Sequence, residues 1–171
     1  TEELIRRLKR AQFARQKVEI FKPAIDVRYD EEKVVSHDAN EIRSTPVPAA
    51  ANIPILADGC DVVGIDEAQF FDDGLVDVVD QLAKAGKQVI LAGLDLDYLS
   101  RPFKPIPELV GRAEYVTKML AVCHRCGAPA GYTQRIVHSD ELVVLGATDA
   151  YEARCRLCYD PTEPEQPKLI E

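Results

Sequence analysis

Two pairs of cysteines have the spacing of a tetrahedral metal site. Cys123 and Cys126 form one Cys-x-x-Cys pair, Cys155 and Cys158 form another, and the 28 residues 127–154 separate them. Thiolates of two such pairs are common ligands of structural zinc, and a site with four protein ligands stabilises a fold and has no position for a substrate. Disulfide bonds and a redox-active dithiol are the alternative interpretations. We predict a structural zinc site at these four residues.

Two further residues of metal-binding type have simpler interpretations. His124 lies beside a ligand cysteine but would be a fifth ligand, so we expect it to be a solvent-exposed residue of the turn. Cys60 has no partner nearby in the sequence, and we expect it to be a small buried apolar residue.

Two adjacent acids, Asp66 and Glu67, follow an apolar run. At the end of a strand, one carboxylate can hold Mg²⁺ while its neighbour takes a proton from a reacting hydroxyl, as phosphoryl transfer requires. Acids also end many strands of parallel sheets without a catalytic role, and that alternative stays open. Gln69, Phe70 and Phe71 follow immediately; they suit the lining of a pocket, although the two phenylalanines also suit the core.

Several single residues are weaker candidates for the same chemistry. The hydroxyl of Thr1 stands at the start of a predicted helix, where it could be a magnesium ligand or an ordinary helix cap. Arg28 could neutralise phosphate charge or be a solvated loop residue. Tyr98, Phe103 and Tyr151 could stack on a base or take part in local packing.

The acids must be positioned by the elements around them. Residues 61–65 and 88–93 are short apolar runs rich in β-branched residues, which is typical of strands buried on both faces of a sheet. An amphipathic helix pattern covers 75–83 between them and ends at Gly86. Strand, helix and strand in this order predict a right-handed crossover and therefore an α/β fold with a parallel sheet.

The flanking segments have patterns of their own. We expect an amphipathic helix over 1–16 and a strand over 18–21. A polar loop is expected over 26–40, and the three prolines and the alanines of 45–54 predict a turn or linker. A further strand is expected over 115–122, with short β segments from the first cysteine pair onward.

The composition restricts the class of protein. The chain has 171 residues, 46% of them hydrophobic, and a net charge of -8. This length suits one main domain with a small appendage, and the negative charge argues against a nucleic-acid partner. No apolar run approaches the ~20 residues of a membrane span and no signal-peptide pattern is present, so we expect a soluble cytoplasmic protein.

Taken together, the residues resemble the type II thymidine kinases, the zinc-containing cytosolic kind, as far as Tyr159. The resemblance is carried by Thr1-Glu2-Glu3-Leu4, Lys22-Pro23-Ala24-Ile25-Asp26-Val27-Arg28-Tyr29, Asp66-Glu67-Ala68-Gln69-Phe70-Phe71, Gly93-Leu94-Asp95, Ala121-Val122-Cys123 and Cys155-Arg156-Leu157-Cys158-Tyr159. It implies transfer of the γ-phosphate of ATP to the 5′-hydroxyl of thymidine or deoxyuridine, a salvage step for DNA synthesis. It also implies a P-loop, RecA-like parallel sheet with a small zinc-bearing lasso subdomain.

The resemblance assigns roles at the acid pair. Glu67 would be the general base, and Asp66 would hold magnesium through water. The ATP and magnesium site that it implies consists of these two acids with Thr1, Asp26, Arg28, Ala68 and Gln69.

The resemblance also implies a nucleoside pocket closed by a lasso whose backbone reads the base edge. Its residues would be Phe70, Tyr98, Phe103, Thr133, Leu142, Val143, Val144, Leu145, Gly146 and Tyr151. The zinc site would pin both ends of the lasso. The domains expected are a nucleotide-binding domain over 1–122, the zinc-binding lasso subdomain over 123–159 and a disordered tail over 160–171.

Family members carry a strand and a glycine-rich phosphate loop ending in Gly-Lys before the position of Thr1, and we expect this segment to precede Thr1 in the intact protein. The resemblance further implies a homotetramer that is inhibited by dTTP and has no nucleic-acid or membrane partner. Two other classes stay open: a different P-loop ATPase carrying a zinc ribbon, and a zinc-ribbon binding module on an inert α/β scaffold.

Overall fold

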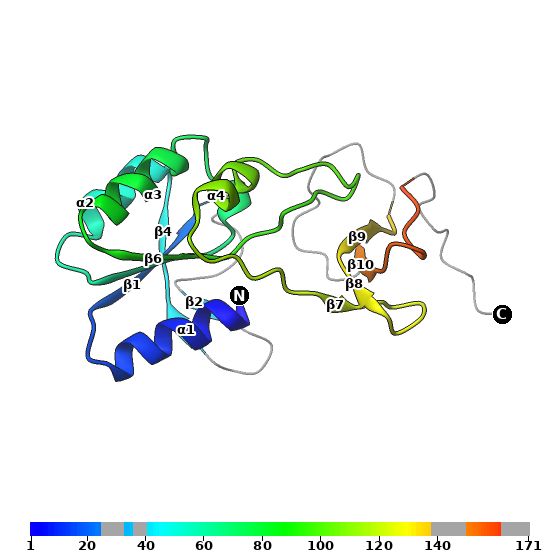
Figure 1. The fold of residues 1–171 in the computed structure, drawn as a ribbon, viewed down its shortest axis with the longest axis horizontal. Coiled ribbons are helices and arrows are strands. Elements are labelled where there is room, and N and C mark those ends of the chain that lie inside the picture. Colours follow the sequence, from blue (N-terminus) through cyan, green and yellow to red (C-terminus); the bar gives the residue numbers. More distant parts are fainter. Residues whose placement is uncertain (25–32, 36–40, 138–149, 162–171) are drawn as a thin grey trace. The chain divides into compact units, whose positions relative to one another are not determined.

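The computed structural model describes residues 1–24, 33–35, 41–137 and 150–161. The chain forms two compact units (Figure 1). One unit comprises Thr1–Leu94 and Lys104–Arg112, and the other comprises Asp95–Phe103 and Ala113–Glu171. The expected domains over 1–122, 123–159 and 160–171 stay a prediction, because compact units and functional domains need not share boundaries.

The first unit is built around a parallel sheet with the strand order β4-β1-β5-β6. Its strands are β1 (Val18–Pro23), β4 (Thr45–Val47), β5 (Val62–Ile65) and β6 (Gln88–Leu91). In the register of the sheet, Ile65 of β5 lies opposite Phe21 of β1 and Leu91 of β6. β5 has a neighbour on each side and apolar clusters on both of its faces, and it is buried along its whole length. The predicted α/β fold with a parallel sheet is confirmed.

Helices cover both faces of this sheet (Figure 1). On one face, α1 (Glu2–Phe13) packs through its apolar stripe, which consists of Leu4, Ile5, Leu8 and Ala11. On the other face lie α2 (Ile53–Leu56), α3 (Leu75–Lys84) and α4 (Ile106–Arg112), with the short 3-10 turns η1 (Ala50–Asn52) and η2 (Ala68–Phe70). None of the helices in the described ranges has the length and apolar character needed to cross a membrane.

Gly64 lets α1 approach the sheet closely. A Cβ atom at this position would lie 2.6 Å from Leu8 Cδ1 and 3.3 Å from Ile20 Cγ1. Both neighbours are fully buried and have little room to move. Because successive strand residues point to opposite faces, Val62 joins the cluster under α1 and Val63 joins the cluster under α3.

The described residues of the second unit contain four short strands. They are β7 (Ala121–Val122), β8 (Pro129–Ala130), β9 (Tyr132–Arg135) and β10 (Tyr151–Arg154). β7 pairs with β8 and β9 pairs with β10, in both cases antiparallel. The prediction of short β segments around the cysteine pairs is confirmed.

The expected turn or linker over 45–54 was wrong. Thr45–Val47 forms the edge strand β4, in which Pro46 lies opposite Lys22 of β1. An edge strand tolerates proline, because the nitrogen that cannot donate a hydrogen bond can face away from the sheet. The residues after it continue into η1 and α2, whose residues Ala50 and Ile53 are buried.

Two other expectations about elements were wrong in part. Within the expected loop over 26–40, Lys33–Val35 forms β2, which pairs antiparallel with β3 (Glu41–Arg43); residues 25–32 and 36–40 lie outside the described residues. Of the expected strand over 115–122, only Ala121–Val122 is a strand. Residues 115–120 are irregular, because a run of apolar residues does not by itself form the ladder of a strand.

We predict that Gly64→Ala destabilises the fold, whereas Gly111→Ala in α4 does not. The new methyl group at position 64 meets Leu8, so the free energy of unfolding should fall by about 1–3 kcal/mol. A Cβ at Gly111 has no atom within 4 Å, and alanine there should raise the free energy of unfolding by up to about 1 kcal/mol. Urea denaturation of both variants measures the difference, and equal stabilities would contradict the close approach of α1.

Candidate active site and metal centre

The turn after β5 is held by its neighbouring strands. The backbone N–H of Asp66 donates to the carbonyl of Phe21 in β1, with an N–O distance of 2.9 Å. The N–H of Ala68 donates to the carbonyl of Ala92, just beyond β6, at 3.0 Å. The acid pair therefore lies at the carboxyl edge of the parallel sheet, where α/β folds bind ligands.

Thr1 and Asp66 lie together at this edge. Thr1 Oγ1 donates to the carboxylate of Asp66, at 3.2 Å from Oδ2 and 3.4 Å from Oδ1. Asp66 is buried, and Thr1 is the N-cap residue of α1. A hydroxyl and a carboxylate are oxygen ligands that suit Mg²⁺, so this pair fits a magnesium site.

Glu67 has an unusual backbone conformation. Its φ of 50° and ψ of 41° fall in the left-handed region, which residues with a side chain rarely adopt. Gln69 Nε2 donates to Glu67 Oε2 at 2.7 Å, and Gln69 Oε1 accepts from the N–H of Leu94 at 3.0 Å. Gln69 is buried and braces the carboxylate of Glu67 against the chain after β6. Strained residues of this kind cluster at functional sites.

The pKa of Glu67 is raised. Burial of the carboxylate is the main cause, and the negative charge of Asp66 adds to it, while the hydrogen bond from Gln69 opposes the rise in pKa. Much of the residue surface still faces solvent, which limits the rise. A carboxylate whose pKa is shifted toward neutrality suits a general base.

The remaining predicted residues of this site have different surroundings. Ala68 is fully buried in the core, and its predicted contact with nucleotide stays a prediction. Phe70 is half-buried in η2, whereas Phe71 belongs to the core under α3, as the simpler interpretation expected. Asp26 and Arg28 lie outside the described residues.

The four predicted metal ligands come together. The Sγ atoms of Cys123, Cys126, Cys155 and Cys158 all lie within 4.8 Å of one another, and those of Cys126 and Cys155 are 3.6 Å apart. A tetrahedral zinc ion with bonds of about 2.3 Å sets sulfur–sulfur distances of roughly 3.8 Å. The cluster therefore fits a zinc ion in both ligand type and size, and all four thiols are free.

Short turns present the two cysteine pairs. The N–H of Gly127 donates to the carbonyl of Cys123 at 2.9 Å, and the φ of +74° at Gly127 is accessible to glycine. In the second turn, the carbonyl of Cys155 accepts from the N–H groups of Cys158 and Tyr159. These turns direct the thiols of each pair toward one point.

The thiols of the cluster influence each other's pKa. Burial raises the pKa of Cys123, but hydrogen bonds from the backbone at Cys155 and Cys126 outweigh it and lower the pKa to about 6. Hydrogen bonds with the neighbouring sulfurs, Cys155 first, raise the pKa of Cys158 to about 12. Four crowded thiols resist complete deprotonation on their own, and a divalent cation supplies the missing positive charge.

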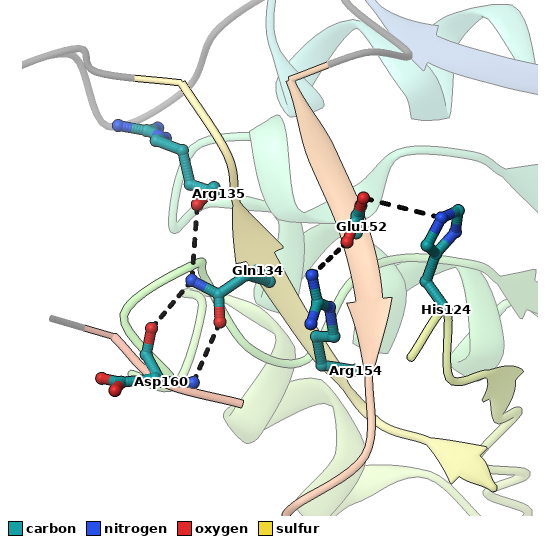
Figure 2. A network of polar contacts seen from close by, with 6 residues as sticks. All are labelled: His124, Gln134, Arg135, Glu152, Arg154 and Asp160. Carbon is teal, nitrogen blue, oxygen red and sulfur yellow. Dashed lines mark hydrogen bonds and ion pairs between the residues drawn. The ribbon is translucent and has the colours of Figure 1, made fainter. Parts of the chain in front are cut away.

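His124 and Cys60 lie apart from the ligand set. The side chain of His124 is 71% exposed, and its Nε2 lies 3.7 Å from Glu152 Oε1 (Figure 2). The prediction of a solvent-exposed turn residue is confirmed. Cys60 is partly buried against the core of the first unit, in agreement with its expected apolar role.

Two predicted aromatic residues share one arginine. The guanidinium carbon of Arg135 lies 3.6 Å from the ring centroid of Tyr98 and 5.4 Å from that of Tyr151. Arg135 Nη2 also donates to the hydroxyl of Tyr151 at 2.9 Å. Arg135 is buried and was missed by the sequence analysis, because an arginine in a short strand gives no indication of a distant aromatic partner.

Two other predicted nucleoside residues of the second unit have neighbours of their own. Thr133 lies in β9 opposite Ala153 of β10. The backbone N–H of Phe103 donates to the carbonyl of Asp95. The lasso residues Leu142, Val143, Val144, Leu145 and Gly146 lie outside the described residues.

The fold and these sites define an α/β protein with a candidate phosphoryl-transfer site and a separate four-cysteine metal centre. A family model described as "Thymidine kinase" matches residues 1–159. The chain belongs to the thymidine kinase family.

Similar proteins agree with this assignment. A thymidine kinase of Rhodothermus sp. is 61% identical over 164 residues, covering 96% of this chain and 77% of that protein. A thymidine kinase of Bacteroides thetaiotaomicron is 58% identical over 159 residues, covering 93% of this chain and 80% of its own length. A thymidine kinase of Porphyromonas gingivalis is 58% identical over 159 residues, with coverages of 93% and 78%.

We predict that the protein binds one zinc ion per chain and that Cys155→Ser releases it. The variant removes a buried ligand of the cluster, so the second unit should lose its fixed structure. Cys60→Ser is the matched control, because it removes a thiol outside the cluster and should leave the zinc content unchanged. Metal analysis and circular dichroism measure both effects. Retention of zinc in Cys155→Ser would contradict the assignment of this ligand.

Proposed function

We propose that the protein is an ATP-dependent thymidine kinase, which transfers the γ-phosphate of ATP to the 5′-hydroxyl of thymidine and also accepts deoxyuridine. Membership of the thymidine kinase family supports the substrate and the reaction. The observation that carries the mechanism is the placement of Thr1, Asp66 and Glu67 at the carboxyl edge of the sheet. Membership of the thymidine kinase family argues against the two alternatives, a different P-loop ATPase and an inert scaffold.

The two acids have distinct proposed roles. Glu67, with its raised pKa and its brace from Gln69, takes the proton from the 5′-hydroxyl. Asp66 and Thr1 hold Mg²⁺, which when bound neutralises charge on the phosphates of ATP. Asp26, Arg28 and Ala68 complete the proposed nucleotide site.

The metal centre has a structural role in this proposal. The four cysteines hold zinc and fix the bases of the segment that carries the proposed lasso, Leu142–Gly146. The proposed nucleoside contacts in the second unit are Tyr98, Phe103, Thr133 and Tyr151. Phe70 is a proposed nucleoside contact in the first unit.

Regulation, assembly and localisation are proposed on the family resemblance alone. The protein is a cytoplasmic homotetramer in this proposal, inhibited by dTTP and without a nucleic-acid or membrane partner. The net charge of -8 supports the last point with respect to nucleic acid.

We predict that Glu67→Gln lowers kcat for thymidine phosphorylation by about 10²–10⁴-fold, because the amide cannot accept the proton. Thymidine binding should be retained, since the side chain keeps its size. Glu114→Gln, which changes an exposed glutamate, is the matched control and should leave kcat unchanged. Steady-state kinetics with thymidine and ATP measure both variants, and normal turnover of Glu67→Gln would exclude Glu67 as the base.

The pH dependence of the reaction should report the same group. Because the pKa of Glu67 is raised above its ordinary value of 4.5, its basic form is lost at a higher pH than for an unperturbed glutamate. We therefore expect kcat/KM for thymidine to fall with decreasing pH through an apparent pKa above 4.5. The same acid limb in the residual activity of Glu67→Gln would show that another group titrates.

A further inference from the structure

The segment Asp95–Phe103 forms a hairpin that is closed by its own hydrogen bonds; it is called the Tyr98 hairpin below. At its base, the N–H of Phe103 donates to the carbonyl of Asp95 at 2.9 Å, and Leu96 bridges to Pro102. At its turn, Asp97 Oδ1 accepts from the backbone N–H groups of residues 99 and 101. Because the hairpin is internally bonded, a contact at one residue can set the position of the whole segment.

Tyr98 is held at its backbone as well as at its ring. The hydroxyl of Tyr159 donates to the carbonyl oxygen of Tyr98, which lies 61 positions earlier in the chain, with an O–O distance of 2.7 Å. The guanidinium group of Arg135 lies against the ring of Tyr98. Both contacts come from elements next to the cysteine turns.

Tyr159 is itself fixed by the second cysteine turn and by β9. It follows Cys158 directly, and its N–H donates to the carbonyl of Cys155 at 3.0 Å. Its ring stacks on that of Tyr132 in β9, with the centroids 4.8 Å apart and the planes at 22°. These contacts fix the position of the Tyr159 hydroxyl independently of the hairpin.

The residue after Tyr159 is fastened to the same strand. The buried side-chain amide of Gln134 donates to the carbonyl of Asp160 at 2.8 Å and accepts from the N–H of Asp160 at 2.9 Å. Figure 2 shows this pair of hydrogen bonds, in which the side-chain amide of Gln134 bonds to the backbone of Asp160 as a paired strand would. The chain on both sides of the Tyr159 ring is thus anchored.

We propose that Tyr159 is a positioning residue that connects the second cysteine turn to the Tyr98 hairpin and thereby sets the affinity for the nucleoside. The proposal rests on the proposed function, in which Tyr98 and Phe103 are nucleoside contacts. Without the Tyr159 hydroxyl, the hairpin keeps its own hydrogen bonds and its contact with Arg135. The loss should therefore loosen the hairpin without unfolding the second unit.

The test compares Tyr159→Phe with Tyr132→Phe in the full-length protein. Each variant removes one hydroxyl from the same stacked pair of rings, and only that of Tyr159 reaches the hairpin. Three quantities are measured for each: the zinc content, the kinetic constants for thymidine, and the amide hydrogen exchange of residues 96–101.

For Tyr159→Phe we expect KM for thymidine to rise about five-fold, the effect of one neutral hydrogen bond, with kcat changed less than about two-fold. Hydrogen exchange in 96–101 should be faster by a similar factor, and the zinc content should be unchanged. Tyr132→Phe should match the wild type in all three quantities. The split between KM and kcat distinguishes positioning from a general loss of folded protein.

Other results overturn the proposal. Unchanged exchange in 96–101 would show that the hydroxyl does not hold the hairpin, and faster exchange without a rise in KM would show that the hairpin does not set nucleoside affinity. Loss of zinc from Tyr159→Phe would place the role of the hydroxyl in the cysteine turn itself. If the wild type does not phosphorylate thymidine, the proposed function fails, and thymidine binding with the exchange data then decides the role of Tyr159.

Discussion

The contact of Leu8 with the bare backbone of Gly64 sets the geometry of the first unit. Since glycine leaves no side chain on that face of β5, α1 lies directly against the strand. Thr1 begins this helix about two turns before Leu8, and Asp66 follows Gly64 by two residues. The 3.2 Å distance between the Thr1 hydroxyl and the Asp66 carboxylate is therefore tied to a packing contact some distance away. The magnesium site that we propose at Thr1 and Asp66 needs this kind of rigid support, because Mg²⁺ tolerates little deviation from its preferred oxygen positions.

The second unit is organised by a different force. Among the residues that the structure describes, its cluster of buried apolar residues consists of Cys123, Ala130 and Cys155, and two of these are predicted metal ligands. Such a small apolar core does not hold a fold alone, and a zinc ion at the four cysteines would supply the stabilisation that apolar burial cannot. Buried polar side chains complete the unit: Gln134 bonds to the backbone of Asp160, and Arg154 pairs with Glu152, which also faces His124 (Figure 2). Tyr159, which directly follows the second cysteine pair, donates to the carbonyl of Tyr98. The cysteine cluster and the position of Tyr98 are therefore connected through one residue.

The sequence predicted those parts that have a local pattern. β5, α3 and β6 follow from periodicity, the cysteine cluster from spacing, and the acid pair from its place after a buried run. β4 was not predicted, because three residues that include a proline resemble a turn. Only their pairing with β1 makes them a strand. α4 was not predicted, because Pro107 stands in its first turn; proline is favoured there, but in a sequence alone it is also typical of turns and loops. Gln134, Arg135 and Tyr159 could not be found, since the Gln134 and Tyr159 partners lie 26 and 61 residues away and nothing local marks them.

The left-handed backbone of Glu67 has an evolutionary consequence. A side chain in this region costs on the order of 1 kcal/mol or more, and glycine would relieve that cost. Glycine would also remove the carboxylate that we propose as the general base. Selection for heat resistance alone should accordingly favour loss of glutamate at this position, whereas selection for growth on scarce nucleoside should restore it. The backbone conformation at Glu67 thus opposes thermal stability to turnover. Variants recovered from a screen for thermal stability alone should be sequenced at position 67 and assayed for kinase activity.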